Sequence, residues 1–123
     1  MKIRIKADTI RFRLDKNDIQ CLQDSGHTKE ETTIAGGKLH FCIKAKPIEE
    51  AVIKLDPFAV HLLYPEQKLM EWTSNDDNGI YFSITNADGS ILQITLEKDY
   101  KCLTTRDEDE SASFDNPLTA HNC

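Results

Sequence analysis

Hydrophobic and polar residues alternate along most of this chain, beginning with the opening stretch MKIRIKADTIRFRL. In residues 2–6 and 9–14, apolar side chains occupy every second position, and charged or polar ones fill the positions between them. Such period-two alternation is typical of half-buried β-strands. The pattern predicts a hairpin with a two-residue turn at Ala7-Asp8. Its expected inward-facing pairs are Ile5 with Ile10 and Ile3 with Phe12.

Three more hairpins and two short helices are expected farther along the chain. Strands are predicted on both sides of three dipeptides that favour tight turns: Gly36-Gly37, Asp56-Pro57 and Asp88-Gly89. One amphipathic helix is expected after Asp15, which can cap its N-terminus, and a second is expected after Pro65. The apolar pairs that define the helical faces are Ile19 with Leu22 and Leu69 with Trp72.

The order of these elements in residues 2–45 repeats in residues 52–99, which we interpret as an internal duplication of a ββαββ unit. Aligning IKAD at 5–8 with IKLD at 53–56 matches the two copies. This alignment places Lys6 on Lys54, Arg11 on Ala59 and Arg13 on His61. The predicted fold class is α+β, as an antiparallel eight-stranded barrel-like domain without edge strands or as two stacked sheets.

A single domain over residues 1–103 is expected from a chain of 123 residues. The alternation stops beyond this point. Residues 104–123 contain the acidic run RDEDE, small polar residues and an Asn-Pro pair. This composition predicts an extended or disordered acidic tail, because it offers too few apolar side chains for a core.

Composition narrows the expected environment and partners. The net charge of -6 disfavours nucleic-acid binding, which is typical of basic domains. Charges interrupt the N-terminus, and no apolar run approaches the roughly 18 residues of a membrane span, so a cytoplasmic location without a membrane partner is expected. No metal site and no cofactor are expected, because the four cysteines are widely separated. They are Cys21, Cys42, Cys102 and Cys123.

The first hairpin concentrates positive charge in an otherwise acidic chain. Five of the fifteen basic residues lie on its polar face: Lys2, Arg4, Lys6, Arg11 and Arg13. The predicted register places Arg4 opposite Arg11 and Lys2 opposite Arg13, and opposed like charges destabilise a sheet. An anion is therefore expected to compensate them. We predict an anion-binding site at these five residues and identify no catalytic residue.

The sequence leaves three sources for this anion open. The first is a set of carboxylates on neighbouring strands: Glu30, Glu31, Glu97 and Asp99. The second is the acidic run 107–110, folded back over the hairpin. The third is an external partner, either a phosphorylated small molecule or an acidic protein segment. If the charged face points into a barrel, its lining would include Lys44, Lys54 and His61. A homodimer is also left open.

The opening block MKIRIKADTIRFRL with DKNDIQCLQDSG, and the closing block EKDYKCLTTRDEDE with FDNP, resemble a family of small bacterial proteins of unknown function. The resemblance covers nearly the whole chain and implies no activity. A duplicated eight-stranded barrel is also similar to triphosphate-tunnel enzymes, but their Glu-x-Glu-x-Lys opening is missing here. A non-enzymatic binding module is therefore expected. The alternative, a phosphate-ester or polyphosphate hydrolase, would need Glu31 and Glu97 beside the basic face.

Overall fold

The computed structural model describes residues 1–100, which form eight strands and two short helices. In chain order these are β1 (Lys2–Lys6), β2 (Thr9–Leu14), α1 (Lys16–Ser25), β3 (His27–Ile34), β4 (Gly37–Lys46), β5 (Val52–Asp56), β6 (Ala59–Pro65), α2 (Glu66–Thr73), β7 (Gly79–Thr85) and β8 (Ile91–Lys98). The expected hairpins and helices are therefore confirmed. The predicted acidic tail lies outside the described residues.

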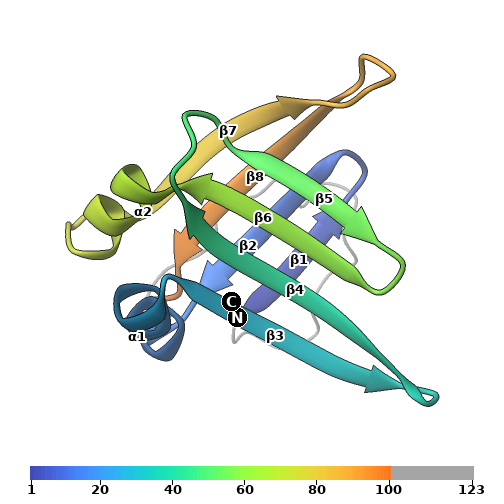
Figure 1. The fold of residues 1–123 in the computed structure, drawn as a ribbon, viewed down its shortest axis with the longest axis horizontal. Coiled ribbons are helices and arrows are strands. Elements are labelled where there is room, and N and C mark those ends of the chain that lie inside the picture. The colour runs from blue at the N-terminus through green and yellow to red at the C-terminus, as the bar shows by residue number, and fades with distance from the viewer. Residues whose placement is uncertain (101–123) are drawn as a thin grey trace, which may run out of the picture.

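The eight strands form two four-stranded sheets that face each other (Figure 1). The first sheet has the strand order β1-β2-β8-β7, and the second has the order β3-β4-β6-β5. The expectation of a closed antiparallel barrel is wrong, because β2 runs parallel to β8 and β4 runs parallel to β6. The two-sheet arrangement is the one observed. Alternation could not decide between them, because a strand with one buried face has the same period in parallel and antiparallel sheets.

Each sheet combines hairpins from both halves of the chain. The first sheet joins the β1-β2 hairpin to the β7-β8 hairpin, and the second joins the two middle hairpins. The two halves of the chain are joined within each sheet by a parallel strand pair, β2 with β8 and β4 with β6. Each sheet therefore has two edge strands, with β1 and β3 on one side of the sandwich and β7 and β5 on the other. The halves share an order of elements, and a duplicated gene origin stays a prediction.

The two halves correspond at a shift of 50 residues, because Ile3 pairs with Phe12 in β1-β2 where Ile53 pairs with Leu62 in β5-β6. The expected alignment was wrong by two residues. It placed the second turn at Asp56-Pro57, whereas β5 includes Asp56 and the turn is formed by residues 57 and 58. Under the corrected shift, Lys2, Arg4, Lys6, Arg11 and Arg13 correspond to Val52, Lys54, Asp56, His61 and Leu63.

The core lies between the sheets, and both helices cover one end of it (Figure 1). The four hairpin turns lie at the opposite end. The helices contribute Leu22, Leu69 and Trp72, each at most 2% exposed. The buried strand residues are Phe12, Leu14, Ile43, Leu62, Tyr64, Ile94 and Leu96. Neither helix described in residues 1–100 has the length and apolar character that a membrane span requires.

Local geometry accounts for the helix start and for two turns. Asp15 and Asp18 form a reciprocal capping box, in which each backbone N–H donates to the other's carboxylate at 3.0 and 2.9 Å. Ala7 has φ 49, a left-handed conformation that costs a non-glycine residue about 1–2 kcal/mol. The β3-β4 turn is formed by Ala35-Gly36 and not by the expected Gly36-Gly37, because Gly37 already belongs to β4.

Candidate functional site

The five predicted site residues lie together on the outer surface of the first sheet. We call this group the cationic face: Lys2, Arg4, Lys6, Arg11 and Arg13. Its predicted register is confirmed, because Lys2 pairs with Arg13 and Arg4 pairs with Arg11. Phe12 and Leu14 alternate with these charges and are 0% and 1% exposed, so the apolar side of the hairpin faces the core. The charged side is therefore the outer side of the sheet, and the idea that it lines a barrel lumen is wrong.

Two carboxylates compensate part of this charge. Glu97 lies beside Arg13 in the parallel β2-β8 pair. Its Oε1 is 3.4 Å from Arg11 Nε and 3.5 Å from Arg13 Nε. Asp99 Oδ2 is 3.0 Å from Lys2 Nζ. Both residues were expected to do this from a strand beside β1, but β8 lies beside β2, on the other side of the hairpin.

The other two expected carboxylates bind different groups. Glu30 Oε1 lies 2.7 Å from the Met1 ammonium. Glu31 lies in the second sheet, where its carboxylate is 3.5 Å from the amines of Lys38 and Lys29. These two cations hold the pKa of Glu31 below its usual value. The expectation that Glu30 and Glu31 neutralise the cationic face is therefore wrong.

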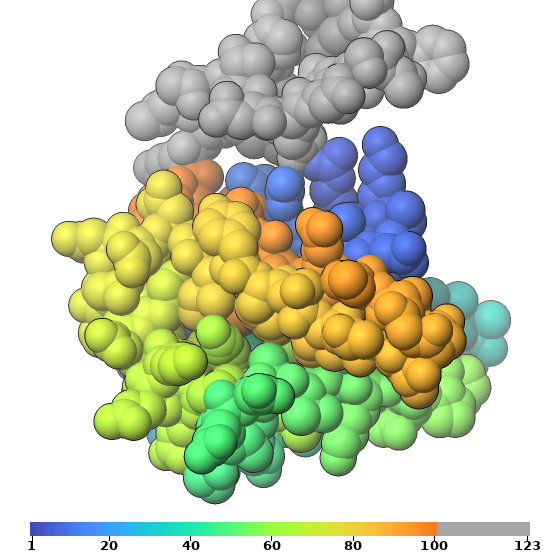
Figure 2. Space-filling view, turned by 90° about the horizontal axis from the view of Figure 1, so that it is seen from above, coloured from blue at the N-terminus to red at the C-terminus, as the bar shows by residue number. Residues whose placement is uncertain are grey.

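Uncharged polar residues extend the cationic face across β8 and β7. Thr95 of β8 pairs with Arg11 on one side and with Tyr81 on the other. Tyr81 is 68% exposed, so its ring is available at the surface. Figure 2 shows the N-terminal strands in blue, with side chains that rise from the surface. An extended ligand that follows these strands could contact several of their side chains at once.

The three residues that were expected to complete a luminal lining lie elsewhere. Lys44, Lys54 and His61 are on the outer surface of the second sheet, because their neighbours Ile43 and Leu62 point into the core. His61 Nε2 is 3.0 Å from Asp56 Oδ2 and pairs across the strands with Lys54. The structure does not bring these residues to the cationic face.

Metal ligation has no candidate within residues 1–100, where no group of three or more His, Cys, Asp or Glu side chains is placed to hold an ion. Cys42 is buried and Cys21 is exposed, and both are free thiols. The remaining cysteines and the acidic run 107–110 lie outside the described residues.

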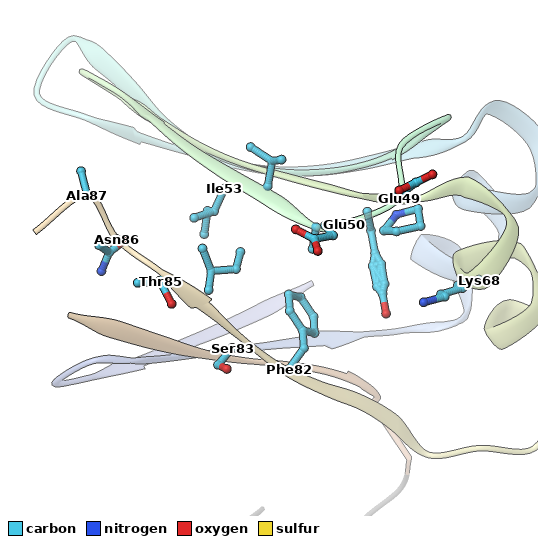
Figure 3. Close-up of a pocket in the computed structure, with 14 residues that line it drawn as sticks. Glu49, Glu50, Ile53, Lys68, Phe82, Ser83, Thr85, Asn86 and Ala87 are labelled. Carbon is cyan, nitrogen blue, oxygen red and sulfur yellow. The ribbon is translucent and has the colours of Figure 1, made fainter. Parts of the chain in front are cut away.

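A second candidate site lies between the edge strands β5 and β7 (Figure 3). This β5-β7 cleft has a volume of about 790 Å³. Its apolar walls include Ile53, Phe82 and Ile84, which are partly buried and pack against the core. Its polar lining includes Glu50, Tyr64 and Lys68. The cleft therefore combines an apolar surface with groups of both charges.

The polar groups of the cleft come from β6, from α2 and from the connection between β4 and β5. Tyr64 is the last residue but one of β6 and packs edge-on against Phe82, with ring centroids 5.1 Å apart and planes at 77°. Burial raises the pKa of the Tyr64 hydroxyl. Lys68 of α2 and Glu50 both direct their charged ends toward the cleft (Figure 3). No pattern in the sequence indicates this group, because its members meet only when the two sheets stack.

Ion pairs close the opposite side of the sandwich, between β1 and β3. The Met1 ammonium lies 2.9 Å from Asp18 Oδ2 and 2.7 Å from Glu30 Oε1. Thr28 Oγ1 donates to Asp18 Oδ1 at 2.7 Å. Burial by itself raises the pKa of Asp18, but hydrogen bonds from Thr28 and the ammonium outweigh it and lower that pKa. We call this cluster of Met1, Asp18, Thr28 and Glu30 the ammonium lock.

The chain matches one known protein family over nearly its whole length. The model of DUF7009, a family of unknown function, matches residues 1–118. The chain belongs to this family. The expected resemblance to a family of unknown function is confirmed, while a bacterial origin stays a prediction. No curated protein and no solved structure matches this chain.

Proposed function

We propose that this member of DUF7009 is a non-enzymatic binding module whose cationic face recognises an extended or multiply charged anion. One observation carries the proposal. Five cations share one outward face of the first sheet, and two carboxylates, Glu97 and Asp99, accompany them within the described residues. This face thus gathers one third of the fifteen basic residues of a chain whose net charge is -6.

The spread of the cationic face over two paired strands favours a ligand that reaches several cations. An exposed ion pair contributes only about 0.2–1 kcal/mol, so a single small anion would bind weakly. A linear anion that contacts four or five of these side chains would add the contributions together. Arg11 and Arg13 present planar guanidinium groups suited to phosphate or carboxylate, and the lysines add positive charge. Polyphosphate, a phosphorylated ligand and an acidic peptide share this chemistry.

The chain's own acidic run is a competitor for the same surface. Asp107, Glu108, Asp109 and Glu110 lie outside the described residues and follow Asp99 by eight positions. An extended chain of that length reaches about 25 Å, which exceeds the roughly 17 Å length of a five-residue strand such as β1. As a tethered anion the run would act at a high effective concentration. It would weaken the binding of external anions without abolishing it.

The hydrolase alternative receives less support from the geometry. Glu31 belongs to the second sheet, and Glu97 is held between Arg11 and Arg13. Phosphoryl hydrolysis with two metal ions would need carboxylates gathered beside the cations. The described residues bring only Glu97 and Asp99 there, and each is paired with a cation. A phosphate-release assay with polyphosphate and Mg2+ that stays at background agrees with the binding proposal.

Fluorescence-detected titration with labelled polyphosphate tests the proposal on the full chain. The variant Lys2→Gln/Arg4→Gln/Lys6→Gln removes three charges from the exposed edge strand. We expect it to lower the affinity by about tenfold or more, since several phosphate contacts are lost together. Affinity of the unchanged chain should also fall steeply with added salt.

A matched control removes the same charge from the other sheet. Lys29→Gln/Lys38→Gln/Lys54→Gln lies on β3, β4 and β5, outside the cationic face. It should retain most of the affinity. Equal losses in the two triple variants would show that net charge alone controls binding and would reject the site. A third variant with the four acids of 107–110 changed to amides should bind more tightly if the tail competes.

A further inference from the structure

The β5-β7 cleft and the ammonium lock occupy matching places in the two halves of the molecule. The shift of 50 residues puts Lys68 of α2 where Asp18 stands in α1. The strand pairings extend the match to the edge strands. In the second sheet, Thr28 of β3 pairs with Ile43 of β4, which pairs with Leu62 of β6. In the first sheet, Ile80 of β7 pairs with Leu96 of β8, which pairs with Phe12 of β2. Because Phe12 corresponds to Leu62, Thr28 corresponds to Ile80, and Glu30 therefore corresponds to Phe82.

The side chains at these matching positions differ in charge: one side has two carboxylates, and the other has a cation and an apolar ring. In the first half, the carboxylates of Asp18 and Glu30 bind an α-ammonium group whose residue, Met1, packs against the core. In the second half, Lys68 supplies a positive charge and Phe82 supplies an apolar wall. The position matching Met1 is Ala51, an internal residue of the chain that brings no terminal charge. The cleft therefore keeps the architecture of the lock without its internal ligand.

The charged residues of the cleft are also not paired with each other. Within residues 1–100, neither the Lys68 ammonium nor the Glu50 carboxylate takes part in a hydrogen bond or an ion pair, although both residues line the same cleft. The walls near them are the apolar side chains Ile53, Phe82 and Ile84. A molecule with two opposite charges and an apolar body would complement both the charged groups and the apolar walls of the cleft (Figure 3).

We propose that the β5-β7 cleft binds a small zwitterionic ligand with an apolar body, such as an apolar amino acid or a short apolar peptide. Lys68, with the nearby Tyr64 hydroxyl, receives the carboxylate, and Glu50 receives the ammonium. Ile53, Phe82 and Ile84 contact the apolar side chains. At about 790 Å³ the cleft has room for more than one residue, which favours a di- or tripeptide over a free amino acid. This proposal does not depend on anion binding at the cationic face.

Titration of the isotope-labelled full chain, followed by amide NMR shifts, tests the assignment. The probes are Val-Leu and Leu-Val-Leu with free termini, the same peptides with an N-acetyl or a C-terminal amide group, free leucine, and decanoate. We expect saturable shifts that centre on residues 49–53, 64–68 and 82–86. Free peptides should bind at least about fivefold more tightly than either blocked form, since each block removes one charge-assisted contact.

Charge-neutral variants at exposed positions identify the partners. Lys68→Gln should weaken the binding of free and N-acetylated peptides by about five- to tenfold and leave the binding of the amidated form unchanged. Glu50→Gln should weaken the binding of free and amidated peptides by a similar factor and leave the binding of the N-acetylated form unchanged. Lys54→Gln, on the outer surface of the second sheet, is the matched control and should bind like the unchanged chain. Absence of saturable shifts with every probe overturns the proposal. So does a result in which the Lys68 and Glu50 variants lose the same affinity for the N-acetylated peptide and the same affinity for the amidated one. Tighter binding of decanoate than of any peptide overturns it as well.

Discussion

The two open sides of the sandwich are built from matching elements but differ in how they are closed. On the β1-β3 side, the carboxylates of Asp18 and Glu30 hold the Met1 ammonium and join the first sheet to the second. On the β5-β7 side, Lys68 and Phe82 stand at the matching positions and a cleft is present. One backbone arrangement thus forms a structural lock in one half and a candidate ligand site in the other. A few side chains decide which of the two results.

The largest expected effect follows from removing the centre of the lock. Asp18 is 7% exposed and accepts hydrogen bonds from Thr28 and the Asp15 backbone in addition to its ion pair. Asp18→Ala should lower the free energy of unfolding by about 2–4 kcal/mol, because the helix cap, a buried hydroxyl partner and a charge partner are lost together. Urea unfolding followed by circular dichroism measures the loss.

The matching change on the other side should have little effect on stability. Lys68→Ala removes an exposed side chain that forms no hydrogen bond or ion pair within residues 1–100, so the expected change is within about 0.5 kcal/mol. The comparison fails if the two alanine variants are equally destabilised. That result would show that α1 and α2 depend on these positions only for helix propensity.

Acid should weaken the lock selectively, because the pKa of Asp18 is lower in the folded chain than in the unfolded one. A lowered folded pKa gives stability that is present above the unfolded value, about 3.9, and is lost as pH falls through the folded value. The stability difference between the unchanged chain and Asp18→Ala should therefore shrink between pH 5 and pH 2. Urea midpoints at each pH measure it. Comparison with the variant removes the contributions of Glu31 and Asp88, whose pKa values are also lowered.

Local patterns in the sequence were sufficient to predict the first hairpin and its charges. Alternation over residues 2–14 gave the pairing of Arg4 with Arg11, because a two-residue turn fixes the register of a hairpin. Capping chemistry similarly placed the start of α1 at Asp15. These features depend on residues that are close in sequence, so their physics can be read from a short segment.

Contacts between the halves could not be read in this way. The parallel pairing of β2 with β8 joins residues about 80 positions apart, and it places Glu97 beside Arg13. The expected neighbour of β8 was β1, because barrel closure was inferred from strand number. The β5-β7 cleft was missed for the same reason. Its walls are edge strands of different sheets, and alternation carries no information about which edges adjoin.

Glycine substitutions in the turns of the first and third hairpins should change the free energy of unfolding by intermediate amounts of opposite sign. Ala7 has φ 49, so Ala7→Gly should relieve a left-handed strain and stabilise the chain by about 0.5–1 kcal/mol. Pro57, at the matching position, has no left-handed backbone, and Pro57→Gly should destabilise by about 0.5–1 kcal/mol through unfolded-state entropy. Urea unfolding measures both. Destabilisation by both glycines would show that the Ala7 conformation is not strained.

The outer surfaces of the two sheets should combine a small change in stability with a change in anion binding. Glu97 lies between Arg11 and Arg13 on a partly exposed face, so Glu97→Gln should change the free energy of unfolding by less than about 1 kcal/mol. The same variant should raise polyphosphate affinity by about two- to fivefold, because it removes a resident competitor for both guanidinium groups. Asp56→Asn makes the same charge change beside His61 on the second sheet and serves as the control. If both variants raise the affinity equally, the gain comes from net charge, and the two outer surfaces do not differ in function.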